Sequence, residues 1–175
     1  MPGFTATRAR RLCSRMKRFR ETLCMAVAVL MAVLLDTNIL LRLLQPHHPH
    51  CASAEHALLT LRARNEVLYL TVQNLVEFWA VITRPIDENG LGLTTEQATA
   101  DVNSLKRLFV LLPEAPLLTE WERLVAAYGV AGKSTHNAHL VAAMIVHEVK
   151  TILTFNIGDF SRYAEIAVLD TKTLA

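Results

Sequence analysis

Three acidic residues stand within or just after apolar segments of the sequence. Asp36 ends an apolar run, Glu77 lies inside the stretch 75–82, and Asp159 follows the segment 151–155. Charged side chains are rarely buried unless they are paired or bind a cation. Carboxylate oxygens are the ligands that hard divalent cations prefer. These three acids are therefore candidate ligands of a metal site.

The elements that must position these acids alternate along the chain from residue 31 onward. Short, continuous apolar runs, typical of strands buried on both faces, are separated by longer segments with helical periodicity. This alternation predicts an α/β fold with three layers, α/β/α, and a central, mostly parallel sheet. The predicted strands are 32–35, 67–71, 109–112, 151–155 and 167–169, and the predicted helices are 38–44, 50–64, 72–83, 95–108, 118–128 and 135–148.

Hydroxyl side chains precede two of these predicted helices. Thr94 or Thr95 is a candidate cap of the helix 95–108, and Ser134 or Thr135 is a candidate cap of the helix 135–148. The predicted loops are 45–49, 85–93 and 113–116, and none has the length or composition of a domain linker. The chain also lacks the glycine-rich phosphate-binding motifs of dinucleotide-binding and P-loop proteins.

The predicted sheet would bring the three acids to one edge. The carboxyl ends of parallel strands meet at the same edge of a sheet, and α/β proteins bind their ligands there. Asp36 would end the first strand, Asp159 would follow the fourth, and Glu77 would lie in the helix after the second. Asn137, in the first turn of the helix 135–148, would add an amide oxygen.

Polar residues beside these acids are candidates to orient them. Thr37, Asn38, Thr154 and Asn156 lie at the predicted strand ends, where their side chains can hydrogen-bond to metal-binding carboxylates. For Thr37 and Asn38, capping of the following helix is an equal alternative.

Four motifs follow one another in an order that resembles a known family. They are LLDTNIL at 34–40, NLVEF at 74–78, HNAHLVAA at 136–143 and LTFNIGDF at 153–160. Residues 31–175 resemble a PIN domain of the VapC toxin class, the ribonuclease half of bacterial toxin–antitoxin pairs. The resemblance implies a metal-dependent endoribonuclease that hydrolyses RNA phosphodiesters with Mg²⁺ or Mn²⁺. It also implies a cognate antitoxin protein and a homodimer as partners, and a cytoplasmic location without a membrane.

The resemblance also assigns roles to residues. Asp36, Glu77 and Asp159 match three of the four acids of the family and are the expected catalytic residues and metal ligands. At the fourth position, where the family usually has Asp, this chain has Asn137, an uncharged oxygen ligand. Because the affinity of hard cations rises with ligand charge, Asn137 should weaken metal binding. The alternative function is a catalytically degenerate PIN domain that binds RNA or an antitoxin without cleaving.

Composition and charge bound the remaining possibilities. A chain of 175 residues with 52% hydrophobic residues is expected to form one domain. Residues 1–30 contain seven Lys or Arg and one acid, and residues 31–175 contain 11 basic and 15 acidic residues, a net charge of −4. RNA would therefore be attracted by local basic groups or by metal ions. The three cysteines form no disulfide or CxxC pattern, which favours a reducing cytoplasm.

Residues 1–30 are expected to be a basic extension outside the domain 31–175. Their Arg-rich start and the apolar run 23–35 imitate a signal peptide, but the run continues into the strand that carries Asp36. The run is also shorter than the roughly 20 residues of a membrane span. We expect a disordered or mis-assigned extension, with translation starting at Met25 or Met31. An export signal and a nucleic-acid-binding arm are the alternatives.

Two other patterns have alternative interpretations. His47 and His48 lie between Pro46 and Pro49, His50 follows Pro49, and the three histidines lack cysteine partners, so we expect a solvated loop rather than a transition-metal site. A receiver domain would need an acidic pair before its acceptor Asp, and a haloacid-dehalogenase-like phosphatase would need Asp-x-Asp after its first strand. The sequence Asp36-Thr37-Asn38 does not fit the second pattern, and the acidic pair of the first is absent from the sequence.

Overall fold

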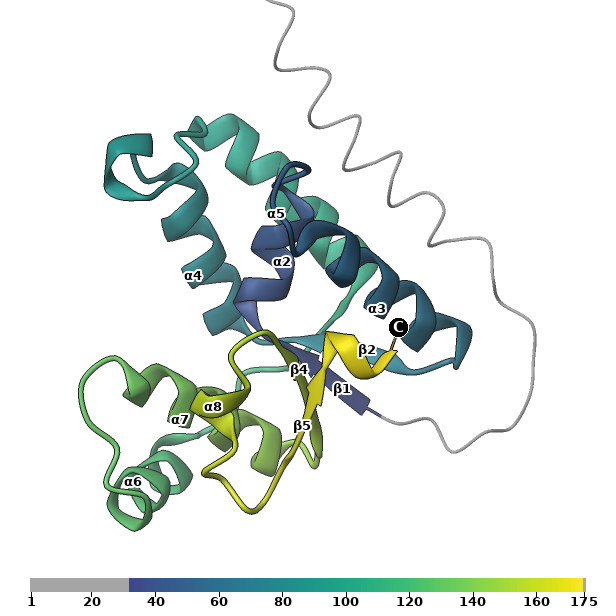
Figure 1. Cartoon of the computed structure of the whole chain (residues 1–175). Coiled ribbons are helices and arrows are strands. Elements are labelled where there is room, and N and C mark those ends of the chain that lie inside the picture. Colours follow the sequence, from purple (N-terminus) through teal and green to yellow (C-terminus); the bar gives the residue numbers. More distant parts are fainter. Residues whose placement is uncertain (1–31, 175) are drawn as a thin grey trace, which may run out of the picture.

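Five strands form one wholly parallel sheet at the centre of the molecule (Figure 1). The structure, a computed structural model, describes residues 32–174. The strand order is β3-β2-β1-β4-β5, so β1 is central and the chain adds strands first on one side of it and then on the other. The strands are β1 (Ala32–Leu35), β2 (Val67–Leu70), β3 (Val110–Leu111), β4 (Thr151–Thr154) and β5 (Ala167–Asp170).

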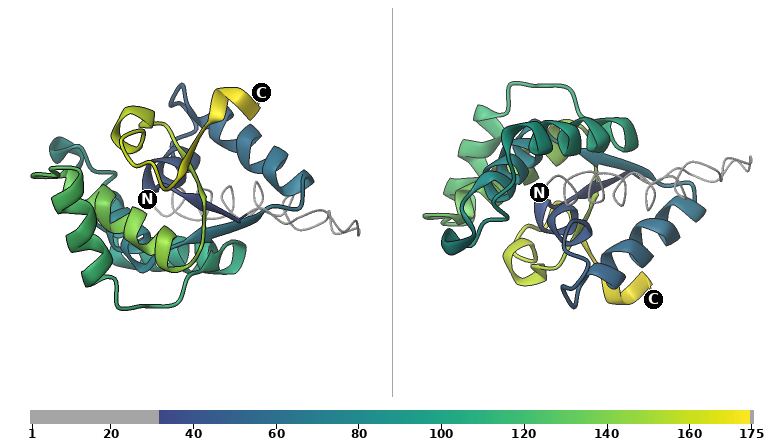
Figure 2. Two further views of the ribbon diagram at one scale, coloured as in Figure 1. Left: turned by 90° about the horizontal axis from the view of Figure 1, so that it is seen from below. Right: turned by 90° about the horizontal axis from the view of Figure 1, so that it is seen from above.

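Helices connect the strands and cover both faces of the sheet. The α-helices are α2 (Thr37–Leu43), α3 (Cys51–Ala63), α4 (Val72–Thr83), α5 (Thr95–Leu108), α6 (Leu118–Ala127), α7 (Ser134–Val146) and α8 (Ile157–Phe160), and the 3-10 helices are η1 (Ile86–Glu88) and η2 (Thr171–Leu174). The two views of Figure 2 place α6 and α7 (green) on the opposite side of the sheet from α3 (blue). The predicted three-layer α/β/α class is confirmed.

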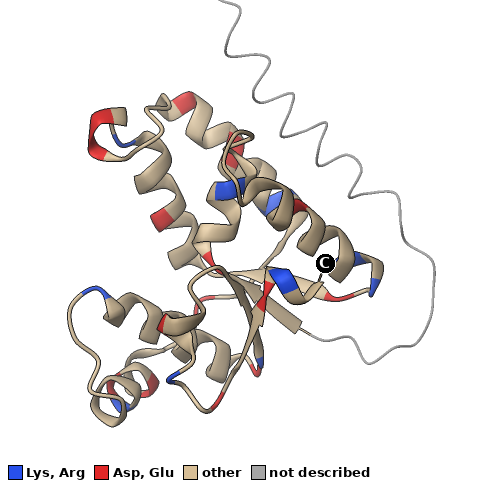
Figure 3. Ribbon diagram, in the orientation of Figure 1, with Lys and Arg blue, Asp and Glu red and all other residues tan. Residues whose placement is uncertain are grey.

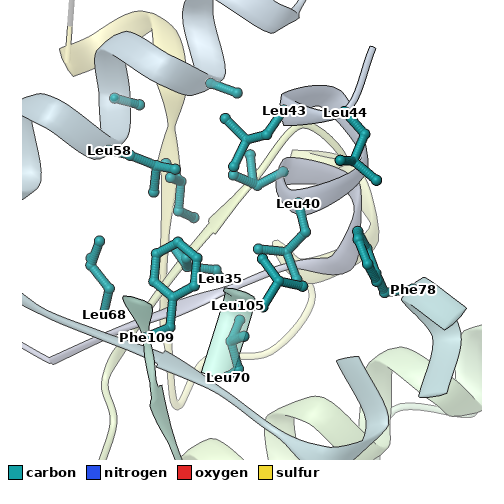
Figure 4. Packing of buried hydrophobic residues seen from close by; sticks show 14 of the residues in the cluster. Leu35, Leu40, Leu43, Leu44, Leu58, Leu68, Leu70, Phe78, Leu105 and Phe109 are labelled. Atoms are coloured by element: carbon teal, nitrogen blue, oxygen red, sulfur yellow. The ribbon is translucent and has the colours of Figure 1, made fainter. Parts of the chain in front are cut away.

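Adjacent residues of β1 enter two separate cores. Val33 and Leu35 pack with α2, α3, α4 and α5 on one face, where leucines from these elements interdigitate (Figure 4). Leu34 packs with α6, α7 and α8 on the other face. Alternate side chains of a strand point to opposite faces, so both faces of the central strand need apolar residues. This is why the strands read as continuous apolar runs.

Three sequence predictions about local structure need correction. The third strand is an edge strand of two exposed residues, Val110 and Leu111, and not a buried strand over 109–112, because only β2 pairs with it. Helix α7 has no side-chain cap, since the hydroxyl of Thr135 donates to the carbonyl of Gly132 instead. The short helix α8 and both 3-10 helices were not predicted, because single turns are too short to show helical periodicity.

Other local predictions are confirmed. Thr94 caps α5 in a reciprocal arrangement with Gln97, as its position before that helix predicted. Within residues 32–174, no helix is both long and apolar enough to cross a membrane. The basic extension 1–30 lies outside the described residues.

Candidate active site

Asp36 occupies the turn between the central strand β1 and helix α2, at the carboxyl edge of the sheet. Asp36 is only 8% exposed. Its Oδ2 accepts hydrogen bonds from Nδ2 of Asn38 at 2.7 Å and from Oγ1 of Thr154 at 2.6 Å. Asp36 stands at the N-cap position of α2, but its side chain makes no capping hydrogen bond. The carboxylate is therefore held by neighbours from α2 and β4 and is not used to start the helix.

The charge on Asp36 is costly in the metal-free protein. Burial raises the pKa of its carboxyl to about 6, the hydrogen bond from Thr154 counteracts this, and the nearby charge of Glu77 raises it further. Among residues 32–174, no Lys, Arg or His forms an ion pair with Asp36. A buried carboxylate without a cationic partner is the environment in which a bound cation has most to compensate.

Glu77 projects from α4 toward the same edge and is fixed by two hydrogen bonds. Its Oε2 accepts from Oγ1 of Thr37 at 2.8 Å, and its Oε1 accepts from Nε2 of Gln73 at 2.6 Å. The side chain is 31% exposed, and Nδ1 of His136 lies 3.9 Å from Oε1. Glu77 is thus oriented by one residue of α2 and one of its own helix, while part of it faces solvent.

A network of buried polar side chains holds Thr37 in place. Nδ2 of Asn74 donates to Oγ1 of Thr37 at 3.1 Å, and Oδ1 of Asn74 accepts from both the amide and the hydroxyl of Thr71 at 2.8 Å. Asn74 is fully buried, and Thr37 and Thr71 are 5% and 7% exposed. Since Asn74 also completes the capping box of α4, the start of this helix is tied to the carboxylate site.

Gln73 links Glu77 to helix α7. Besides its bond to Glu77, Nε2 of Gln73 donates to the carbonyl of His136 at 2.9 Å, and Oε1 of Gln73 lies 2.6 Å from Nδ1 of His139. An amide oxygen only accepts, so Nδ1 of His139 carries the proton in this contact. The first turn of α7, which carries Asn137, is therefore tied to the side chain of Glu77.

Three other predicted site residues are more exposed. Asp159, a predicted ligand in α8, and Asn156, a predicted supporting residue just before it, are exposed, and the predicted ligand Asn137 is half-buried. None of these three side chains hydrogen-bonds to another residue of the chain between 32 and 174. The amide of Asn156, and not its side chain, contacts the site by donating to Oγ1 of Thr154 at 2.9 Å. The structure thus brings Asp36 and Glu77 together, whereas among residues 32–174 the side chains of Asn137 and Asp159 have no hydrogen-bond partner.

The donor set is one of oxygens. Carboxylates and an amide with no thiolate are suited to a hard cation such as Mg²⁺ or Mn²⁺. In the described part of the chain, no group of three or more His, Cys, Asp or Glu side chains is gathered closely enough to hold a metal ion. Figure 3 shows Lys and Arg (blue) distributed over several elements, with no single element rich in them. The oxygen atoms of these residues therefore suit a divalent ion, and the fold already holds the carboxylates of Asp36 and Glu77 in place.

A groove of about 430 Å³ adjoins Glu77. It lies between α4, α7 and the loop before α6, and Glu77, Gln73, His136 and His139 stand on its wall. Its lining also includes apolar side chains such as Val76, which is 62% exposed.

Three supporting residues were missed in the sequence. Thr71, Gln73 and Asn74 hydrogen-bond to each other, to Thr37 or to Glu77, and none was a candidate site residue. The spacing Thr71-x-x-Asn74 is a capping pattern, and Gln73 precedes Glu77 by four residues on one helix face. Both signals were in the sequence, but the contact of Asn74 with Thr37 joins positions 37 residues apart.

Comparisons with known proteins identify the family and the fold. The family model of the PIN domain matches residues 33–166. A search of curated proteins gave no match. VapBC2 from Rickettsia felis, solved bound to a DNA fragment from its promoter, is 17% identical, with a TM-score of 0.60 over 80% of this chain and 98% of that chain.

Two further solved structures are similar. VapBC from Salmonella typhimurium, solved bound to DNA, is 14% identical, with a TM-score of 0.58 over 81% of this chain and 99% of that chain. VapC20 from Mycobacterium tuberculosis, described as a Sarcin-Ricin loop cleaving toxin, is 18% identical, with a TM-score of 0.52 over 77% of this chain and 96% of that chain. At these identities the structures establish the fold alone.

Proposed function

Because the chain belongs to the PIN domain family, we propose that it is a metal-dependent endoribonuclease and the toxin component of a toxin–antitoxin system. The fold is VapC-like, and PIN domains are typically nucleases that use divalent metals. The observation that carries the proposal is the pair Asp36 and Glu77: a buried carboxylate that has no cationic partner among residues 32–174 stands beside a second, oriented carboxylate. Without a cation, these two carboxylates have a high free energy, so the arrangement favours binding of a divalent ion.

Metal binding, orientation of the attacking water and support of Asp36 would fall to different residues. Asp36, Glu77, Asn137 and Asp159 would hold Mg²⁺ or Mn²⁺, which supplies positive charge to the phosphate and lowers the pKa of the attacking water. Glu77, held by Thr37 and Gln73, would orient that water. Asn38 and Thr154 keep the Asp36 carboxylate in one orientation, which leaves its Oδ1 without a hydrogen bond from either side chain. RNA is the proposed substrate.

Partners follow from the same family. The similar structures from Rickettsia felis and Salmonella typhimurium are VapBC structures. We propose that this chain likewise binds a small cognate antitoxin protein, and that it forms a homodimer. The exposed apolar residues Val72 and Val76, which line the groove beside Glu77, support the presence of a protein-binding surface near the site.

A second candidate function rests on one substitution. Asn137 stands where the family usually has an acid, and without that charge the cluster holds a divalent ion less tightly. A PIN domain that binds RNA or an antitoxin without cleaving would tolerate this change. Asn137 is compatible with both functions, and a measurement of RNA cleavage distinguishes them.

Cleavage of a labelled structured RNA by the full chain, with Mg²⁺ or Mn²⁺, tests the proposal. The variants are Asn137→Asp, which restores the usual acid, and Asp36→Asn, which keeps an acceptor for Asn38 and Thr154 but removes the charge. Even outer-shell partners of metal ligands typically contribute 10- to 100-fold, so we expect Asp36→Asn to lower cleavage by more than about 100-fold.

The three proteins together separate the two functions. Cleavage by the natural chain that disappears in Asp36→Asn supports a ribonuclease that tolerates an amide ligand. Cleavage by Asn137→Asp alone identifies a degenerate domain whose function is binding. Equal cleavage by the natural chain and Asp36→Asn would contradict the proposed site.

A further inference from the structure

Three aromatic rings lie close together next to the candidate active site: His50 stacks on Phe155, and His48 is tilted relative to His50. The His50 imidazole lies over the Phe155 ring with a centroid distance of 4.7 Å and an interplanar angle of 29°, and His48 lies 5.3 Å from His50 at 38°. His50 is exposed, whereas His48 and Phe155 are half-buried. None of the three is used by the proposed metal site. The histidines His48 and His50, expected to be solvated, therefore contact each other and the ring of Phe155.

One amide joins this stack to the catalytic edge. Phe155 directly follows Thr154, whose hydroxyl donates to Asp36. The backbone amide of Phe155 donates to Oδ1 of Asn38 at 3.3 Å, while Nδ2 of the same Asn38 donates to Asp36 at 2.7 Å. The backbone amide of Phe155 and the carboxylate of Asp36 are thus hydrogen-bonded to the same side chain.

The segment that carries the stack is free of acids. Residues 37–54 contain Arg42, His47, His48 and His50 and no Asp or Glu, although residues 31–175 carry a net charge of −4. Arg42 also hydrogen-bonds to Gln45 at the start of the loop. A phosphate backbone that crosses the carboxyl edge would meet less repulsion here than over an acidic segment.

The geometry of His48 fits a neutral ring. Its Nδ1 accepts a hydrogen bond from the backbone amide of His50 at 3.1 Å, which requires Nδ1 to be unprotonated. Burial, followed by the charges of Arg42 and His50, lowers the pKa of His48. The loop is therefore held by a neutral imidazole, and that contact sets the position of His50.

We propose that His48, His50 and Phe155 form a stacking subsite for an unpaired nucleobase of an RNA strand that passes Asp36, with Arg42 near its phosphates. The proposal rests on the ribonuclease function proposed above. Bases of single-stranded nucleic acids stack on aromatic side chains whatever their identity, because every base has a π-face. The subsite would position the strand and not take part in the chemistry.

The test is binding of a single-stranded RNA oligonucleotide that carries 2-aminopurine, whose fluorescence is quenched by stacking. Measurements in EDTA with the full chain prevent metal-dependent cleavage. The variant is His50→Ala, and the matched control is His47→Ala, an exposed imidazole of the same loop outside the stack. His50→Phe keeps a ring without a titratable nitrogen, and Phe155→Leu keeps an apolar side chain without a ring.

We expect His50→Ala and Phe155→Leu to weaken binding by about 5- to 100-fold and to remove the quenching, in line with the loss of one stacked base. His47→Ala should bind within about twofold of the natural chain, and His50→Phe should restore binding and quenching. Because His50 makes no side-chain cap of α3, its replacement should not unfold the helix.

The results that overturn the subsite are distinct from those that overturn the enzyme. Equal binding by His50→Ala and His47→Ala, or no binding of the RNA by the natural chain, rejects the subsite. Absence of cleavage with Mg²⁺ or Mn²⁺ rejects the nuclease and leaves the EDTA result valid. A His50→Phe variant that fails to restore quenching rejects stacking as the cause.

Discussion

The two halves of the candidate active site differ in how their polar groups are satisfied. In the hydrogen-bonded half, formed by Asp36, Thr37, Asn74 and Glu77, each side chain has a partner from another part of the chain. In the open half, formed by Asn137, Asn156 and Asp159, the side chains have no partner among residues 32–174. The first half is mostly buried, and the second is half-buried or exposed.

This difference has a simple physical origin. A buried polar group without a partner costs free energy, so the protein must supply partners where water is excluded. An exposed group is satisfied by water and can exchange that water for a ligand at little cost. We infer that the fold sets the hydrogen-bonded half in advance, and that a metal ion or RNA completes the open half.

The largest expected difference between the two halves comes from replacing Asn74. In Asn74→Leu, the buried amide of Thr71 loses its acceptor and Thr37 loses its donor, so we expect the free energy of unfolding to fall by about 3 kcal/mol. Asn156→Leu, the control in the open half, should change it by less than about 0.5 kcal/mol. Urea denaturation measures both, and equal effects would show that the halves do not differ.

The charge of Asp36 gives the second test. Its pKa rises from 3.8 to about 6 on folding, so the folded protein binds the proton more tightly and this group destabilises the metal-free protein as pH rises from about 4 to 6. The free energy of unfolding of Asp36→Asn in EDTA at pH 7.5 should therefore exceed that of the natural chain by about 3 kcal/mol. The difference should vanish near pH 4. A less stable variant at pH 7.5 would mean that the negative charge is satisfied without a cation.

Asp159, in the open half, gives the third test. Asp159→Asn should leave the stability in EDTA within about 0.5 kcal/mol of the natural chain, because no protein contact is lost. It should raise the Mg²⁺ concentration required for half-maximal RNA cleavage by about tenfold, because one ligand charge is lost. Asp87→Asn, in the exposed η1, is the matched control and should change neither quantity. An unchanged Mg²⁺ requirement in Asp159→Asn would remove Asp159 from the ligand set.

Gln73 gives the smallest effect, at the boundary of the halves. Gln73→Met keeps the length and helix propensity of the side chain but releases Glu77 from the carbonyl of His136. We expect cleavage to fall by about fivefold, less than the 10- to 100-fold of buried outer-shell partners, because Gln73 is half-exposed. The loss should appear in kcat and not in KM for RNA. A change in KM alone would assign Gln73 to substrate binding.

Much of the fold was predictable because its signals are local. The bounds of β1, α4 and α5 follow from apolar runs and caps within a few residues, and the structure has them as predicted. The order of four motifs along the chain was sufficient to indicate the family that the comparison found. The error in β3 has a long-range cause, because the exposure of this edge strand depends on which strands pair with it. The short helices α8, η1 and η2 were missed for a local reason, since a single turn shows no helical periodicity.

The candidate oxygen ligands, including the uncharged Asn137, and the apolar runs of the strands could be read from the sequence. The contacts between these residues depend on the tertiary structure. Asn74, Thr37 and the partly exposed Glu77 form one hydrogen-bonded network across two helices, and His50 stacks on Phe155 across more than 100 positions of the chain. Such contacts follow from the packing of whole elements, because hydrogen bonds and ring stacking act over a few ångströms in space, whatever the separation along the chain.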